Sequence, residues 1–204
     1  MPSERRNLVP FEVAIVIAAA IVSLPVPVVV PLMIAASLSL WLRGRSWTSV
    51  FGGPALYAAI GAVAGAIALV LALLVSTPLL EAVSDYAVQW SMYPIVRGSG
   101  QSFVMVAIIV AISALAAELV LRGWLVERVL ELGRGNVVIA LLVGACAEAL
   151  VSDGDASARI GAGLFGLGLG GMYVSGARSI VAPVCARLVF SLGALVLEAT
   201  RLVG

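Results

Sequence analysis

The chain has 204 residues, of which 62% are apolar, and its mean hydropathy is +1.16. Soluble domains contain roughly 45 to 50% apolar residues, so this composition predicts a polytopic membrane protein without a separate soluble domain. Twelve arginines oppose eleven carboxylates and leave a net charge of +1, which argues against nucleic-acid binding. The sequence contains no histidine, so no imidazole is available as a base, metal ligand or oxyanion donor.

The first two predicted spans, residues 11–24 and 28–42, are short and are separated by the sequence Leu-Pro-Val-Pro. As one helix, residues 11–42 would be about 48 Å long, whereas the hydrocarbon core of a bilayer is about 30 Å thick. Proline interrupts helices, so we expect an N-terminal hairpin of two short or tilted helices in this region.

Five further apolar segments predict membrane-spanning helices. They are residues 54–74, 102–126, 137–151, 160–174 and 179–197. The loop after the third span, residues 76–100, has room for a short helix at the membrane surface. We therefore expect one all-α domain over residues 1–204, a polytopic bundle of about seven transmembrane helices.

Arginine placement predicts the orientation of this bundle. With seven spans, one side would carry Arg5, Arg6, Arg43, Arg45, Arg128, Arg134 and Arg178. The other side would carry Glu81, Asp85, Asp153 and Asp155, together with Arg97, Arg159 and Arg201. The positive-inside rule then places the N-terminus in the cytoplasm. The bias toward arginine, alanine, valine and glycine is associated with bacterial genomes of high GC content, so we expect a bacterial inner membrane.

Glu118 and Arg122 are the most informative residues, because both lie inside the apolar run 102–126 and share one helix face. A lone charge at the bilayer centre costs about 2.5 to 3.5 kcal/mol on insertion scales, so such residues usually face a protein interior. Two interpretations stay open: a pair that stabilises the helix, or part of a ligand-binding site.

The sequence A-E-L-V-L-R-G-W of residues 117–124 resembles the first motif of the CPBP family of intramembrane proteases. This family includes type II CAAX prenyl endopeptidases and Abi-type bacteriocin-processing or immunity proteins. Its motif E-E-x-x-x-R, usually followed by glycine, matches at Glu118, Arg122 and Gly123. Ala117 replaces the first glutamate, which in the family activates the attacking water.

Two later motifs extend the resemblance to about residues 43–197. The family has F-x-x-x-H in the next span, where this chain has Gly144 and Glu148. Its last motif, H-x-x-x-N/D after a segment like S-[LI]-[WV]-A-P, corresponds to Arg187 and Ser191 after S-I-V-A-P. Both histidines and the asparagine, which orient water or hold the oxyanion in the family, are therefore replaced.

These replacements predict a pseudoprotease. Placed donors to the oxyanion are commonly the largest contribution to such hydrolysis, so the resemblance implies little remaining catalysis. Glu148 and Arg187 have opposite charges on helices that the family fold brings to one cavity. We expect them to form an ion pair beside the pair of Glu118 and Arg122. The alternative is that one of the two lies near the membrane surface. No metal site and no cofactor is expected.

Three functions stay open. The chain could bind a membrane peptide, a lipidated chain or a partner subunit without cutting it. It could be an active glutamate-dependent CAAX-type endopeptidase that uses Glu118 or Glu148. It could also be a small transporter or channel component, although no inverted repeat is evident. The expected partners are the lipid bilayer and such a ligand, not nucleic acid, and the oligomeric state is not predicted.

Three further patterns concern packing and the membrane surface. Two glycine pairs have the spacing of close helix packing, either within the chain or between copies: Gly61 with Gly65, and Gly166 with Gly170. The tryptophans are expected in the aromatic belts at the membrane surface: Trp41, Trp47, Trp90 and Trp124. The charged residues 127–134 are expected to form a solvated cytoplasmic helix end.

Overall fold

The computed structural model describes residues 14, 29–84, 94–97, 100–152 and 156–200, and no strand occurs among them. The α-helices are α3 (Val29–Leu42), α4 (Leu56–Leu71), α5 (Thr77–Ser84), α6 (Gly100–Glu118), α7 (Glu127–Leu132), α8 (Val137–Val151), α9 (Ala156–Ser175) and α10 (Val181–Ala199). Short 3₁₀ turns occur at Trp47–Val50 and Pro94–Val96, and π-helical segments at Ala72–Ser76 and Leu119–Val126. The expected all-α fold is confirmed.

Helices occupy six of the seven predicted spans. The first predicted span, residues 11–24, lies outside the described residues apart from Ala14. Three helical stretches are long and apolar enough to cross a membrane: Leu56–Leu79, Gly100–Leu132 and Val181–Ala199. Two shorter apolar helices are Val30–Leu42 and Val137–Val151. The chain is therefore an integral membrane protein whose helices lie where the apolar runs predict them.

One predicted helix end is wrong. Helical structure continues from α4 through Ala72–Ser76 into α5, which ends at Ser84, whereas the sequence predicts a loop with room for a short helix from residue 76. The fourth helix continues past residue 126 to Leu132, in agreement with the charged helix end expected over residues 127–134.

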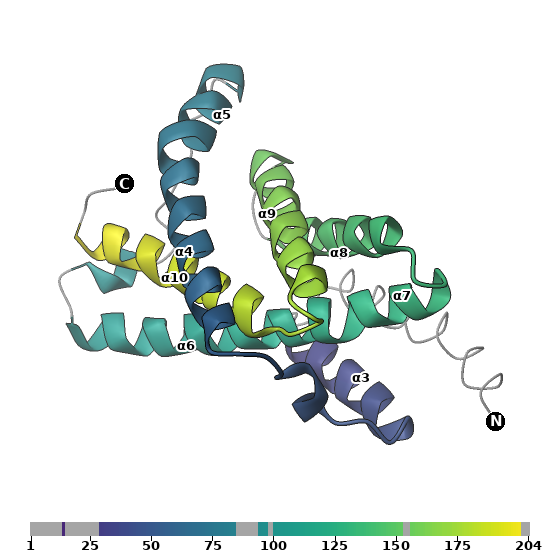
Figure 1. The fold of residues 1–204 in the computed structure, drawn as a ribbon. Helices are drawn as coiled ribbons and strands as arrows, with labels where there is room; N and C mark the ends of the chain where they lie inside the picture. Colours follow the sequence, from purple (N-terminus) through teal and green to yellow (C-terminus); the bar gives the residue numbers. More distant parts are fainter. Residues whose placement is uncertain (1–13, 15–28, 85–93, 98–99, 153–155, 201–204) are drawn as a thin grey trace.

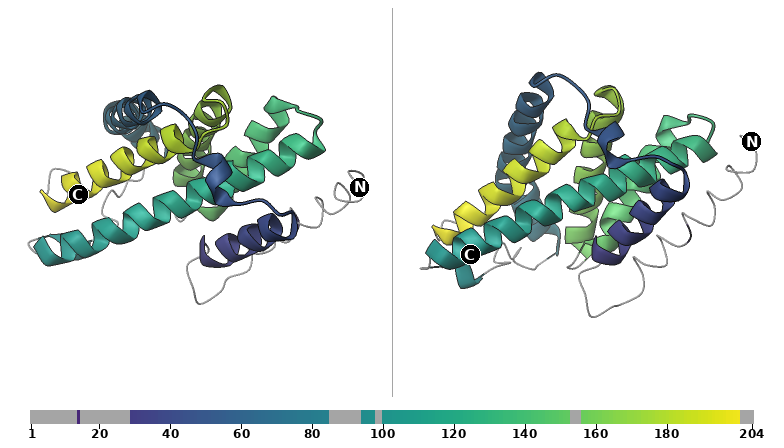
Figure 2. Two further views of the ribbon diagram at one scale, coloured as in Figure 1. Left: turned by 60° about the horizontal axis from the view of Figure 1, so that its bottom comes forward. Right: turned by 90° about the horizontal axis from the view of Figure 1, so that it is seen from below.

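One long helical rod organises the bundle. In Figure 1, α6, the π-helical segment and α7 run across the molecule as one rod of 33 residues. Helix α10 packs against α6 and against α4, while α8 and α9 pair beside the second half of the rod. Helix α3 lies along the π-helical segment in both views of Figure 2. All eight residues of Leu119–Val126 are buried, so the core centres on this segment.

The first glycine pair packs α4 against α10 within the chain. A Cβ atom at Gly61 would lie 2.2 Å from the carbonyl oxygen of Ala182, and one at Gly65 would lie 2.2 Å from that of Ala186. Only glycine permits so close an approach of two helix backbones. The spacing of the two glycines predicts this close packing. Of the two interpretations, packing within the chain is confirmed for this pair.

Trp124 is not a belt residue. Its side chain is fully buried, and its Nε1 donates a hydrogen bond to Ser39 Oγ at 2.9 Å. A buried indole needs an acceptor for its N–H, and Ser39 on α3 supplies it. Trp41 is 73% exposed, and its place in an aromatic belt stays a prediction. Trp90 lies outside the described residues.

Candidate functional site

Four charged side chains meet beside the π-helical segment, and we call them the charge quartet: Glu118, Arg122, Glu148 and Arg187. Glu118 ends α6, and Arg122 lies one turn later in the π-helical segment. Glu148 comes from α8 and Arg187 from α10. π-helical segments frequently occur at functional sites. The rod thus contributes half of the quartet, and two packed helices contribute the rest.

Each guanidinium of the quartet bridges both carboxylates. Arg122 Nη1 donates to Glu118 Oε1 at 3.3 Å and to Glu148 Oε2 at 2.5 Å. Arg187 donates from Nε to the same Glu118 oxygen at 2.5 Å and from Nη2 to the same Glu148 oxygen at 2.6 Å. The two expected ion pairs are both present. They are not separate, however, because every cation contacts every anion in a closed arrangement.

The quartet is buried and electrically balanced. Glu118 and Arg122 are fully buried, and Glu148 is 5% exposed. The Arg187 side chain is 14% exposed. Removing a charge from water is costly, and attraction repays this cost only where the geometry and hydrogen bonds are good. Two positive and two negative charges in mutual contact offset part of this cost, although Glu118 Oε2 and Arg122 Nε have no hydrogen-bond partner among the described residues. The contacts tie together the rod, α8 and α10.

Two neighbours of the quartet were not found from the sequence. Arg122 Nη2 donates to the carbonyl oxygen of Gly166 at 3.0 Å. The Arg187 guanidinium lies over the Phe165 ring, 5.7 Å from its centroid, which is within cation–π range. A main-chain acceptor leaves no signal in the sequence. The spacing of Gly166 and Gly170 indicated a close helix approach but not its partner.

Gly166 also explains how α9 reaches the quartet. A Cβ atom at this position would lie 2.9 Å from Glu148 Cβ and 3.2 Å from Arg122 Nη2. A Cβ atom at Gly170 would lie 2.8 Å from Leu141 Cδ2. The second glycine pair therefore packs α9 against α8. Of the two interpretations, packing within the chain or between copies, the first is confirmed for this pair.

One oxygen of the quartet differs from the others. Glu118 Oε2 is buried and has no hydrogen-bond partner among the described residues. An unsatisfied buried polar atom costs about 1–3 kcal/mol, and a chemical role is one of the reasons for which such an atom is retained. This oxygen is the feature of the quartet that is most compatible with catalysis.

Ala117 and Ser191 do not join the quartet. Ala117 is half-buried and has no polar group in its side chain. Ser191 lies one turn beyond Arg187 on α10, is also half-buried, and takes no part in the four contacts. The described residues contain no group of three His, Cys, Asp or Glu side chains that could hold a metal ion. The expectation that no metal or cofactor is needed stays a prediction.

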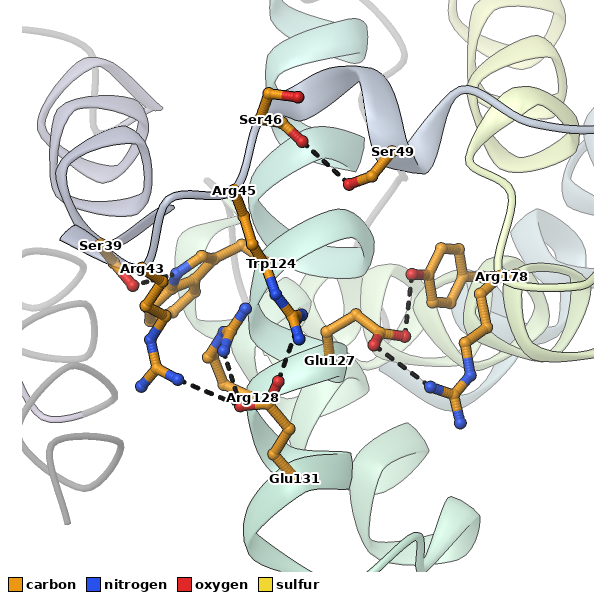
Figure 3. A network of polar contacts seen from close by, with 11 residues as sticks. Ser39, Arg43, Arg45, Ser46, Ser49, Trp124, Glu127, Arg128, Glu131 and Arg178 are labelled. Carbon is orange, nitrogen blue, oxygen red and sulfur yellow. Dashed lines mark hydrogen bonds and ion pairs between the residues drawn. The ribbon is translucent and has the colours of Figure 1, made fainter. Parts of the chain in front are cut away.

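A second polar network, which we call the arginine end, surrounds Glu131 on α7. Arg128 Nη1 contacts Glu131 Oε2 at 2.6 Å. Arg43 Nη1 contacts the same oxygen at 3.4 Å, and Arg45 Nη1 contacts Oε1 at 3.4 Å. Figure 3 shows the three guanidinium groups around the one carboxylate. They come from α7 and from the connection that follows α3.

The arginine end continues to Glu127, one turn earlier. The Tyr173 hydroxyl donates to Glu127 Oε1 at 3.0 Å, and Arg178 Nη1 donates to Oε2 at 3.3 Å (Figure 3). The prediction of a solvated helix end over residues 127–134 is wrong for Arg128, which is 1% exposed. The connection after α3 and the turn after α9 supply neighbours that the sequence alone did not identify.

The family model described as type II CAAX prenyl endopeptidase Rce1-like matches residues 99–193. The matched region contains all four residues of the quartet. The resemblance to the CPBP and CAAX protease family, predicted from three motifs, is confirmed. No curated protein and no solved structure matches the chain.

Proposed function

On the premise that residues 99–193 belong to the Rce1-like family of type II CAAX prenyl endopeptidases, we propose that this membrane protein is a pseudoprotease. It binds a membrane peptide, a lipidated chain or a partner membrane subunit without cleaving it. The family membership supports this class of ligand. The residues that replace the family's motif residues in the site support the loss of cleavage.

The closed charge quartet is the observation that carries this proposal. A general base must reach a water molecule with a free acceptor atom. Here Glu118 Oε1 and Glu148 Oε2 each accept from both arginines. Arg187 and Glu148 stand at the positions where the family motifs have histidine, and Ala117 stands where they have a glutamate. The side chains that would activate water or hold an oxyanion are thus replaced by an ion cluster.

An active endopeptidase is the second candidate, and one observation favours it. Glu118 Oε2 has no hydrogen-bond partner among the described residues. In this alternative, Glu118 is the general base, and a guanidinium of Arg122 or Arg187 donates to the oxyanion.

A cleavage and binding assay separates the two candidates. The full chain is reconstituted in vesicles and incubated with a fluorescent prenylated peptide that ends in a CAAX sequence. The pseudoprotease releases no more product than protein-free vesicles, yet retains the peptide in a binding measurement. Product formation that disappears in a Glu118→Gln variant would establish the enzyme instead. Glu127→Gln is the matched control, because Glu127 lies outside the quartet on the same rod.

The quartet also makes a prediction for binding in this assay. If it serves to hold the site in shape, Arg187→Gln weakens retention of the peptide, whereas Arg178→Gln leaves it unchanged. Equal retention by both variants would mean that the quartet does not hold the site in shape. No retention by the unaltered chain would mean that a prenylated peptide is not the ligand. A membrane peptide without a lipid and a partner membrane subunit would then remain as ligand classes, to be sought by crosslinking in the native membrane.

The proposed setting is a bacterial inner membrane with the N-terminus in the cytoplasm. The arginine bias of residues 43–45, 128 and 178 supports this orientation through the positive-inside rule.

A further inference from the structure

The arginine end carries more positive charge than the whole chain. Four arginines there contact two glutamates, so these six residues have a formal net charge of +2. The full chain has a net charge of +1, which leaves a formal charge of −1 on all other residues together. Positive charge is therefore concentrated at one end of the rod, while the charge quartet is neutral.

The geometry at this end leaves guanidinium surface accessible. The Arg45 side chain is 54% exposed, and its contact with Glu131 is long, at 3.4 Å. Arg43 contacts Glu131 at the same distance but its side chain is only 10% exposed, and Arg128 holds that carboxylate closely at 2.6 Å. A guanidinium has five N–H donors in a planar fork that matches carboxylate and phosphate oxygens. Arg45 in particular can contact Glu131 and present donors to a second anion.

The length of the rod and the residues beside the arginine end favour a position at the level of the lipid headgroups. The rod of 33 residues is about 50 Å long at about 1.5 Å per residue, whereas the hydrocarbon core is about 30 Å thick. Its charged last turns therefore reach the membrane surface. Trp41 and Leu42, immediately before Arg43, are 73% and 63% exposed. An exposed tryptophan next to arginines is typical of the headgroup region.

We propose that the arginine end binds the phosphate group of an anionic phospholipid. The excess of positive charge selects a lipid with net negative charge over a zwitterionic one, because the latter brings its own cation. Basic pockets between membrane helices are suited to such headgroups, and each arginine near the surface contributes to the attraction. The exposed Trp41 and Leu42 contact the acyl region of the same lipid. This site lies apart from the charge quartet and is independent of the proposed function.

The test uses the full chain in detergent micelles, with bound lipid counted by native mass spectrometry. Phosphatidylglycerol is compared with phosphatidylcholine of the same acyl chains. We expect tighter binding of phosphatidylglycerol, and a loss of about fivefold in its affinity for Arg45→Gln. The double variant Arg43→Gln/Arg45→Gln should lose about 25-fold if the two contributions add. Arg159→Gln is the matched control, because Arg159 is an exposed arginine on α9 outside the arginine end.

Three results would overturn the proposal. The first is equal affinity for the two lipids, and the second is an equal loss of affinity in Arg45→Gln and Arg159→Gln. The third is displacement of the lipid by soluble glycerol phosphate at comparable concentration, which would indicate a site for free phosphate anions. Arg45 is exposed, so its variant should unfold at the same temperature as the unaltered chain, and a thermal scan in micelles checks this directly.

Discussion

Each residue of the charge quartet carries a full charge inside apolar helices, and each is paired with the two residues of opposite charge. The sequence identified all four, because a charged residue within an apolar run is conspicuous and the family motifs link the distant positions. It predicted two separate pairs. The structure has a closed set in which Arg122 and Arg187 each contact both glutamates. Which oxygen accepts from which nitrogen depends on helix rotation, and spacing does not determine that.

The Gly166 contact gives a test at the same scale. In Gly166→Ala, the added methyl group would lie 2.9 Å from Glu148 Cβ, so α9 must shift and weaken the Arg122 contact with its carbonyl. Overpacking of this kind costs about 1–3 kcal/mol. The free energy of unfolding in micelles measures this cost.

Gly168→Ala is the control for that measurement. It lies on the same helix, and a Cβ atom there would have nothing within 4 Å. Alanine is a better helix former than glycine by about 1 kcal/mol, so this variant should be neutral or more stable. Equal effects of the two substitutions would contradict the tight contact at Gly166.

At the scale of elements, apolar runs predicted the positions of the helices but not their internal geometry. The π-helical segment Leu119–Val126 has no proline to mark it, and its form depends on the side chains packed around it. Likewise, burial of Trp124 depends on Ser39, which is distant in the sequence and lies on α3. Long-range contacts of this kind are not visible in local periodicity. The glycine spacing of α4 was more informative, because only small residues allow helices to approach so closely.

The contact between α4 and α10 leads to a second prediction. Gly65→Ala places a Cβ atom 2.2 Å from a backbone carbonyl oxygen of α10, which cannot move independently of its helix. We expect the helices to separate and the unfolding temperature in micelles to fall. Ala66→Val, on the exposed face of α4, adds two carbon atoms toward lipid and should leave the unfolding temperature unchanged. A fall of the same size in both variants would argue against helix contact as the cause.

At the scale of the whole molecule, the sequence predicts which charged residues share one side of the membrane, and the structure shows which of them lie together. The sequence assigned Arg43, Arg45, Arg128 and Arg178 to one side of the membrane. In the structure, these four side chains gather in the arginine end, although they come from three separate parts of the chain (Figure 3). The seven-span count rests partly on residues 11–24, which the structure does not describe apart from Ala14.

Thiol labelling in bacterial cells tests the orientation. In a background with Cys146→Ala and Cys185→Ala, single cysteines are placed by Ser46→Cys or by Ala156→Cys. Both positions are exposed: Ser46 follows α3, and Ala156 begins α9, at points that the sequence assigns to opposite sides. With a cytoplasmic N-terminus, a membrane-impermeant maleimide labels the Ala156→Cys variant in intact cells. It labels the Ser46→Cys variant only after the membrane is broken. The reverse labelling pattern would show that the N-terminus lies on the outer side of the membrane.

The central claim is that the opposite charges on α8 and α10 form a mutually dependent cluster, on which the proposed loss of catalysis rests. A double-mutant cycle on Glu148→Gln and Arg187→Gln tests it most directly, with the free energy of unfolding in micelles as the measurement. Each single variant leaves buried charge uncompensated and should cost about 3–5 kcal/mol. The double variant should cost less than the sum by about 2–3 kcal/mol, because each group depends on the other. Costs that add to within about 0.5 kcal/mol would show independent residues and contradict the account.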